Sequence, residues 1–374
     1  MAKKKKTRVD LRKNRTKPPR PQGWTRDFQD HGFLEEGTKG QERVRPKGEL
    51  SRKRTIMQND GPADLAGVVS MPAVDKDACQ PGRVLRVHGL ASVVEALDGK
   101  IFRCVVRRVL RSLVTEERSI VTTGDHVWFR PSASDEGVIE RVEPRHGLLT
   151  RASRGREHVL VANVDQVVIV MAIAEPALKP HLIDRYLVSA GRGQIQPILC
   201  LNKADLGDAV SMQPLIGTYS QLGIQVLLTS VRSGRGIEEL REFMPGRQTV
   251  FAGQSGVGKS SLLNAMEPGL KLTVGEVSDN NNKGKHTTTT AQLIKLEMGG
   301  WVVDTPGIRQ FELWDISPEE LEGFFPEFRP LVPHCAYADC THTHEGGCAI
   351  KRAVALGQIS EHRYISYRGM YDGN

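Results

Sequence analysis

Short apolar runs alternate with longer amphipathic stretches between about residues 161 and 314. Several of the runs are continuously apolar, which is typical of strands that are covered on both faces. Strands that alternate with helical segments predict an α/β domain with a mostly parallel sheet. The runs of strand length are 166–173, 196–201, 225–229, 249–252 and 301–303.

The pattern between residues 82 and 142 consists of short strand-like segments separated by glycine and proline. An Asp98-Gly99 pair lies between two of the apolar runs and is a strong hairpin signal. Such segments predict a small β-barrel, and an OB-fold fits this length. OB-folds often bind nucleic acid, but a β-domain with a purely structural role fits the same pattern.

The first part of the chain, residues 1–77, lacks apolar periodicity. Residues 1–54 contain 18 Lys and Arg against 7 Asp and Glu, a net charge of +11, whereas the whole chain carries +8. We expect little fixed structure in such a segment. We also expect it to bind nucleic acid, because clustered basic residues release the counterions of phosphates. A solubilising tail is the alternative.

These patterns divide the chain into a basic arm (1–77), an OB-fold (78–152), an α/β domain (153–316) and a C-terminal module of short helices (317–374). No apolar run approaches the roughly 20 residues that span a bilayer. The charged N-terminus lacks the apolar core of a secretory signal. We therefore expect a multidomain, cytoplasmic protein that has no membrane partner.

One glycine-rich segment follows the predicted strand 249–252 and precedes an apolar helical stretch. Its sequence is Gly253-Gln254-Ser255-Gly256-Val257-Gly258-Lys259-Ser260-Ser261. It matches the P-loop pattern, in which glycines let backbone N–H groups face phosphates and the helix N-terminus adds positive potential. We expect Lys259 to reach the β- and γ-phosphates and the Ser260 hydroxyl to bind Mg²⁺.

A second motif selects the base. Its residues, which follow the predicted strand 196–201, are Asn202, Lys203, Ala204 and Asp205. The Asp205 carboxylate can accept hydrogen bonds from N1–H and the exocyclic amine of guanine, whereas adenine lacks this pair of donors. Ser230, after the next strand, could support the same edge of the base. Together with the P-loop, this motif predicts binding of GTP and GDP rather than ATP.

Two further segments have the composition of nucleotide-dependent switches. In the D-T-P-G motif at 304–307, Asp304 can hold the Mg²⁺ shell and the Gly307 N–H can sense the γ-phosphate. The polar segment 278–290 ends in four threonines, one of which can bind Mg²⁺ when GTP orders the loop. Thr288 is our candidate, but the sequence does not select among the four, and such a run also favours an edge strand.

The order of these motifs is unusual. The base-reading residues at 202–205 and 230 precede the P-loop, whereas in ordinary GTPases they follow it. A circular permutation preserves the site, because the new chain ends fall in loops. It also places the D-T-P-G motif directly before the C-terminal module.

Three cysteines and one histidine lie close together near the C-terminus: Cys335, Cys340, His342 and Cys348. This donor set suits one closed, tetrahedral Zn²⁺ site, and the metal would be structural because four protein ligands leave no position for water. His334 and His344 are spare candidates for the histidine position. Reduced cysteines in a small helical core are the alternative.

The combination of an OB-like domain, N-K-x-D, G-Q-S-G-V-G-K-S-S, a threonine-rich loop, D-T-P-G and C-x₄-C-x-H-x₅-C resembles the RsgA (YjeQ) family of ribosome small subunit-dependent GTPases. The resemblance covers about residues 80–370 and includes I-D-R-Y at 183–186 and T-P-G-I-R-Q-F at 305–311. It implies a GTPase that binds the 30S subunit and its rRNA, assists late maturation of that subunit and is stimulated by it. We also expect a monomer. The chain departs from the family at Lys285, where arginine is usual, and in the length of its arm.

The group that activates water is not evident from the motifs. Ras-like enzymes place a water-orienting glutamine directly after D-x-x-G, where this chain has Ile308. His286 is our catalytic candidate, because a neutral imidazole can accept a hydrogen bond from water. Gln310 and a group donated by the ribosome are its competitors, and a solvated loop residue is the alternative reading of His286. The alternative function is a GTP-binding chaperone of RNA or ribosome assembly without significant turnover.

Overall fold

The computed structural model describes residues 5–10, 53–58, 74–108, 110, 120–153, 156–208, 210–272, 291–304 and 316–373. The chain divides into two compact units, residues 1–145 and 146–374. Within the described parts, no helix is both long and apolar enough to cross a membrane. The finer division into four parts stays a prediction.

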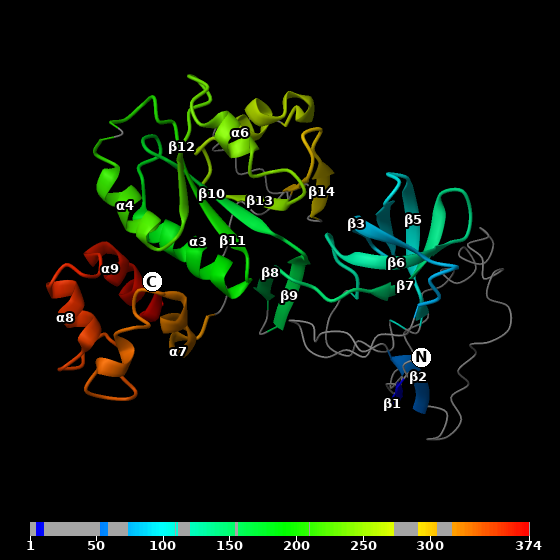
Figure 1. The fold of residues 1–374 in the computed structure, drawn as a ribbon, viewed down its shortest axis with the longest axis horizontal. Coiled ribbons are helices and arrows are strands. Elements are labelled where there is room, and N and C mark those ends of the chain that lie inside the picture. Colours follow the sequence, from blue (N-terminus) through cyan, green and yellow to red (C-terminus); the bar gives the residue numbers. More distant parts are fainter. Residues whose placement is uncertain are drawn as a thin grey trace, which may run out of the picture. The chain divides into compact units, whose positions relative to one another are not determined.

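Five strands of the first unit form a closed barrel (Figure 1). They are β3 (Gln80–His88), β4 (Ala91–Ala96), β5 (Ile101–Val106), β6 (His126–Pro131) and β7 (Glu136–Val142). Their order is β3-β4-β5-β7-β6, and β6 also pairs with β3, so each strand has a partner on both sides. Only the β5–β7 pair of the barrel is parallel. This closed five-stranded barrel confirms the predicted OB-fold.

The barrel forms because alternate residues of its strands are apolar and point inward. Val84, Val94, Phe102 and Phe129 are among the buried residues of its core. The predicted hairpin joins β4 to β5, and Gly99 there has a φ of +82°, which glycine adopts without a steric penalty.

Two strands in the N-terminal segment were not predicted. β1 (Lys5–Asp10) pairs antiparallel with β2 (Lys53–Gln58). These two stretches are regular structure in a segment for which we expected little, and the other residues before 74 lie outside the described part of the chain, so the expectation for the arm stays a prediction.

The second unit contains a six-stranded sheet with the order β12-β11-β10-β13-β15-β14. The strands are β10 (Gln166–Ala172), β11 (Gln196–Asn202), β12 (Gln225–Leu228), β13 (Gln248–Ala252), β14 (Gln292–Lys295) and β15 (Trp301–Asp304). All neighbours are parallel except β14 and β15. Every residue of β10 and β13 is buried, which explains their continuous apolar runs. A hairpin of β8 (Leu149–Ser153) and β9 (Arg156–Val161) precedes this sheet in the chain.

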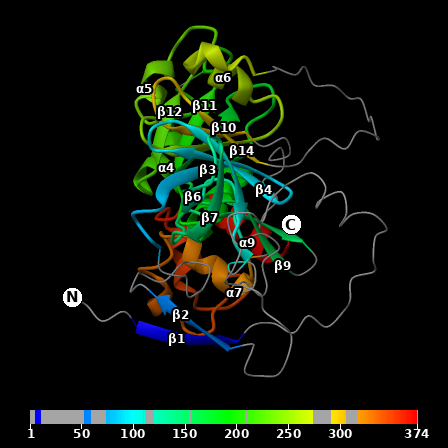
Figure 2. The ribbon, with the colours of Figure 1, turned by 90° about the vertical axis from the view of Figure 1, so that its right-hand side faces the viewer.

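Helices cover both faces of the sheet (Figure 1). α3 (Pro180–Arg192) and α4 (Gln213–Gln221) lie on one face, and α6 (Lys259–Met266) lies on the other, where α5 (Ile237–Arg241) packs beside it (Figure 2). The short 3₁₀ helix η2 (Pro268–Leu270) follows α6. The parallel strands end at one edge of the sheet, where α/β proteins place their ligands.

The C-terminal residues of the second unit form a small helical module. Its elements are α7 (Pro318–Leu321), the 3₁₀ helices η3 (Glu322–Phe324) and η4 (Val332–His334), α8 (Ala349–Ala355) and α9 (Glu361–Tyr371). Phe325, Phe328 and Tyr367 form an aromatic centre in the module, and Val188 of α3 packs into the same core. α9 lies against α3 and α7 (Figure 1).

A buried ion pair joins this module to α3. Arg363 Nη1 of α9 donates to Asp184 Oδ1 at 2.7 Å, and its Nε donates to Glu327 Oε1 at 2.7 Å. Tyr219 of α4 donates to the same Asp184 oxygen at 2.8 Å. Burial acts to lower the pKa of Arg363, but Asp184 and Glu327 outweigh it and raise that pKa above its ordinary value. The guanidinium is therefore charged, and it ties α9 to the helices that cover the sheet.

Candidate functional site

The predicted P-loop connects β13 to α6. Gly253, Gly256 and Gly258 have φ values of +142°, +79° and +95°, which side chains other than glycine rarely adopt. A Cβ atom on Gly253 would lie 2.1 Å from the carbonyl oxygen of Val170. The Lys259 ammonium donates to the carbonyls of Gly253 and Gln254, both at 2.7 Å, so it lies across the loop that it follows. The loop is therefore curled as its sequence requires.

Asn202 connects the base-reading loop to the P-loop. It is 2% exposed and ends β11. Its Nδ2 donates to the carbonyl of Val257 at 2.8 Å, and Thr229 Oγ1 donates to its Oδ1 at 3.0 Å. The structure thus brings together two motifs that lie 55 residues apart in the chain.

Asp205 and Ser230, which both were predicted to read the base, contact one another. The Ser230 hydroxyl donates to Asp205 Oδ1 at 2.6 Å. This hydrogen bond is the main cause that lowers the pKa of Asp205. Next to them, the Ala204 N–H donates to the Thr229 carbonyl at 3.0 Å, and the Lys203 ammonium donates to the Glu175 carbonyl. The carboxylate is therefore ionised and held in one orientation.

Asp304 ends β15, the strand beside the P-loop strand β13. Its position at the carboxyl end of the sheet agrees with a role near the phosphates. The other predicted switch residues lie outside the described part of the chain, and their roles stay predictions: Lys285, His286, Thr287–Thr290, Gly307, Ile308 and Gln310.

Tyr186 is a contact of the P-loop that the sequence did not reveal as such. This residue of α3 is 4% exposed, and the backbone N–H of Gly253 donates to its hydroxyl. Burial raises the pKa of Tyr186, against the effects of Arg185 and of that hydrogen bond. Tyr186 belongs to the I-D-R-Y motif of the family resemblance. The sequence therefore marked this residue, but it did not indicate what the residue contacts.

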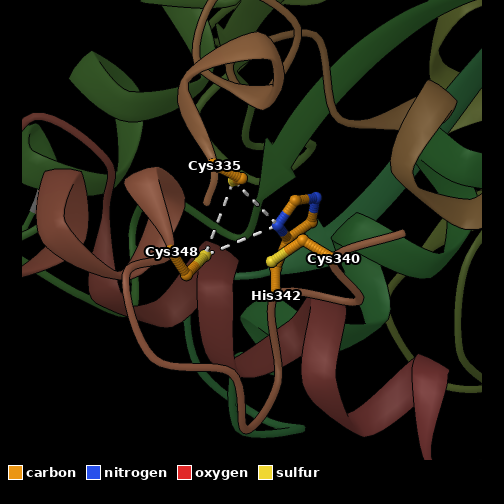
Figure 3. Close-up of side chains that lie close together, drawn as sticks. All are labelled: Cys335, Cys340, His342 and Cys348. Atoms are coloured by element: carbon orange, nitrogen blue, oxygen red, sulfur yellow. Dashed lines mark hydrogen bonds between the residues drawn. The ribbon is translucent and has the colours of Figure 1, made fainter. Parts of the chain in front are cut away.

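The four predicted metal ligands converge (Figure 3). Their ligand atoms all lie within 4.8 Å of one another. His342 Nδ1 lies 3.6 Å from Cys335 Sγ and 3.5 Å from Cys348 Sγ, and these two sulfurs are 4.0 Å apart. Burial raises the pKa of the Cys340 thiol to about 12, so a thiolate here requires a cation beside it. The cluster can hold a metal ion.

The loop that presents His342 is held by side chains outside the motif. His342 has a φ of +61°, an uncommon conformation for a residue with a side chain. The Tyr364 hydroxyl donates to its carbonyl at 2.8 Å, and the Tyr367 hydroxyl donates to the Thr341 carbonyl at 3.0 Å. Although burial acts to raise it, hydrogen bonds led by Thr341 lower the pKa of Glu345 to about 2. The spare candidates His334 and His344 are exposed and do not join the cluster.

A P-loop, an N-K-x-D loop that precedes it in the chain and a parallel sheet joined to an OB barrel define a circularly permuted P-loop GTPase. A sequence model of the RsgA GTPase family matches residues 142–314. The chain belongs to this family, and it is a GTP-hydrolysing enzyme.

Relatives and solved structures agree with this assignment. The small ribosomal subunit biogenesis GTPase RsgA of Moorella thermoacetica is 43% identical and covers 76% of this chain and 94% of its own. The protein of that name from Sodalis glossinidius is 38% identical over 90% of this chain and 95% of its own. The crystal structure of YjeQ from Thermotoga maritima has a TM-score of 0.65 at 38% identity, covering 79% of this chain and 98% of its own. YloQ, described as a circularly permuted GTPase, has a TM-score of 0.63 at 29% identity, covering 80% and 97%.

Asp205→Asn is expected to weaken GTP binding by about 100-fold, because the amide cannot accept both hydrogen bonds from guanine. The same variant should gain affinity for xanthosine triphosphate, whose C2 carbonyl can accept a hydrogen bond from the amide. Fluorescence competition with both nucleotides measures this exchange. Asp208→Asn, which removes an exposed carboxylate from the same loop, is the control. Equal competition by ATP and GTP for the wild-type protein would contradict guanine selection.

Tyr186→Phe should weaken binding of GDP and GTP alike by about 3- to 10-fold, the range for one hydrogen bond. Without the hydroxyl, the Gly253 N–H loses its acceptor, and the start of the P-loop is no longer held in the conformation that binds the phosphates. Nucleotide binding then has to restore that conformation, which lowers the affinity. Titration with fluorescent nucleotide gives the affinities. Tyr219→Phe removes a hydroxyl that reaches Asp184 instead, and it should leave both affinities unchanged. Equal losses in the two variants would show that Tyr186 acts only through general stability.

Purified protein should contain about one Zn²⁺ per chain, as a single tetrahedral site requires. Cys335→Ser and Cys348→Ser should each lose the metal and unfold the C-terminal module while GTP binding is largely kept, because the P-loop lies on another part of the unit. Elemental analysis and circular dichroism measure the two effects. Cys79→Ser, in the barrel unit, should keep its zinc. Stoichiometric zinc in the Cys335/Cys348 double variant would disprove the ligand set.

Proposed function

We propose that this protein assists the late maturation of the small ribosomal subunit in the cytoplasm, as a monomer that hydrolyses GTP to GDP and phosphate when the subunit stimulates it. The observation that supports this most is the permuted nucleotide site joined by Asn202 and Val257. That site lies in a chain that covers 94% to 97% of the length of relatives named for small ribosomal subunit biogenesis.

In this proposal, different residues of the protein bind the phosphates, the base and the Mg²⁺ ion. The P-loop amides and Lys259 bind the β- and γ-phosphates, and Asp205 with Ser230 reads guanine. Mg²⁺ would be held by Ser260 and by Thr288 or one of its neighbouring threonines, with Asp304 close by. Hydroxyl and carboxylate oxygens are donors that suit this ion, which supplies positive charge to the phosphates when it is bound.

The cluster of Cys335, Cys340, His342 and Cys348 would hold one structural Zn²⁺. Three thiols and an imidazole are the donor set of closed zinc sites. Because all four positions come from the protein, the metal would stabilise the module and take no part in GTP hydrolysis.

The barrel and the basic arm provide surfaces for rRNA. A cleft of about 400 Å³ on the barrel is lined by the basic Arg86, His88 and Arg103, by the exposed Ile101 and by one acidic residue, Asp135. Basic groups that reach phosphates supply the part of single-strand recognition that does not depend on sequence. The arm, with its net charge of +11, would add affinity that depends on salt but not on sequence.

His286→Ala tests the catalytic part of the proposal. We expect GTP affinity to be unchanged and turnover in the presence of 30S subunits to fall by about 10²-fold, as for other positioned catalytic groups. The measurement is phosphate release by wild type and variant, each with and without purified subunits.

Gln310→Ala is the matched comparison, because Gln310 is the competing polar group on the other switch. A large loss in this variant, with His286→Ala unaffected, would transfer the role to Gln310. If neither variant changes stimulated turnover, the ribosome supplies the group. A wild type that the subunits bind but do not stimulate would favour the assembly chaperone instead.

A further inference from the structure

A carboxylate outside the metal motif contacts the metal-binding histidine. Glu322 Oε2 lies 2.9 Å from His342 Nε2, while the other ring nitrogen, Nδ1, faces the sulfurs of Cys335 and Cys348. Both nitrogens of the buried imidazole therefore have a partner, and the two partners lie on opposite sides of the ring. Phe328 packs its ring edge-on against this imidazole and limits its rotation.

These contacts select one tautomer of His342. A neutral imidazole has one N–H donor and one nitrogen with a free lone pair. A carboxylate accepts hydrogen bonds and cannot donate them when it is ionised, so the hydrogen is placed on Nε2 and the lone pair on Nδ1. That lone pair points toward the three cysteines.

We propose that Glu322 is the positioning residue of the metal site: by accepting the His342 Nε2–H, it holds Nδ1 as the ligand atom for Zn²⁺. The inference rests on the zinc site of the proposed function. It adds a residue that lies 20 positions away from its partner in the chain.

The same contact links the proposed metal site to the surface of α3. Glu322 begins η3, and Phe324 of η3 packs so closely on α3 that a Cβ atom on Gly191 would lie 3.1 Å from the Phe324 ring. Glu320 of α7 lies 3.5 Å from Arg192 at the end of α3. A metal held by His342 would therefore also hold η3, the element through which this part of the module meets α3.

Glu322 can be changed without opening a cavity in the core. Its side chain is 36% exposed, and it lines a cleft of about 590 Å³ together with Glu320 and Arg192. Water can therefore fill the space that a shorter side chain leaves, so loss of metal in a variant is separable from collapse of the module.

The experiment compares zinc affinity among Glu322→Ala, Glu322→Gln and Glu320→Ala, by competition of full-length protein with a chromophoric chelator. Glu322→Ala should bind zinc about 10- to 100-fold more weakly, as for other groups that orient a metal-binding histidine. Glu322→Gln keeps an oxygen that accepts the Nε2–H, so it should recover most of that loss. Glu320→Ala removes the same charge from the same cleft but does not contact His342, and its affinity should equal that of the wild type.

Each other outcome has a definite meaning. Wild-type affinity in Glu322→Ala, with one zinc in the wild type, would overturn this inference alone. Equal losses in Glu322→Ala and Glu320→Ala would show that the cleft charge matters and that the contact with the ring does not. A wild type without zinc would refute the proposed metal site itself, and this inference with it. Circular dichroism and GDP binding show that the variants are folded.

Discussion

The second unit depends on the buried ion pair between Asp184 and Arg363. Circular permutation makes β15 the last strand of the sheet in the chain, so the polypeptide leaves the nucleotide site there and continues into the C-terminal module. Without further contacts, the module would be held to the sheet and its helices only by the chain. The ion pair closes the connection across 179 residues of sequence. Removal of either partner would leave an uncompensated buried charge, at a cost of about 3–5 kcal/mol.

Helix α3 contacts both the P-loop and the C-terminal module, because different faces of the helix carry the contacting residues. Asp184, Val188 and Gly191 follow helical spacing and meet the module through Arg363, the aromatic core and Phe324. Tyr186 lies two positions from Asp184, about half a turn around the helix, and reaches the first amide of the P-loop. The short I-D-R-Y stretch therefore contacts the nucleotide loop on one side and the module on the other, which gives a physical meaning to its place in the family resemblance.

Features that arise from neighbouring residues could be predicted from the sequence. The strands of the barrel and of the parallel sheet were visible in the apolar pattern, and the P-loop and the Cys/His cluster were visible in their spacing. The bonds that join them were not, because they connect residues far apart in the chain. Nothing near Asn202 specifies Val257 as its acceptor, and nothing in the spacing of the cysteines indicates Glu322. The strands β1 and β2 were missed for a related reason: apart from Val9, Ile56 and Met57 their residues are polar or charged, so the sequence shows no apolar alternation there.

The contact between Gly258 and Asn202 has a consequence for how such a protein can be inherited and altered. A Cβ atom on Gly258 would lie 2.5 Å from Asn202 Nδ2, in a space that the asparagine side chain already fills. The two motifs therefore share one volume, although they occupy separate stretches of the gene. A genetic rearrangement can reverse their order, since loops tolerate new ends. It cannot place a side chain at Gly258 while Asn202 stays, because the asparagine already fills that space. The two positions are therefore constrained as a pair, whatever the order of their motifs in the chain.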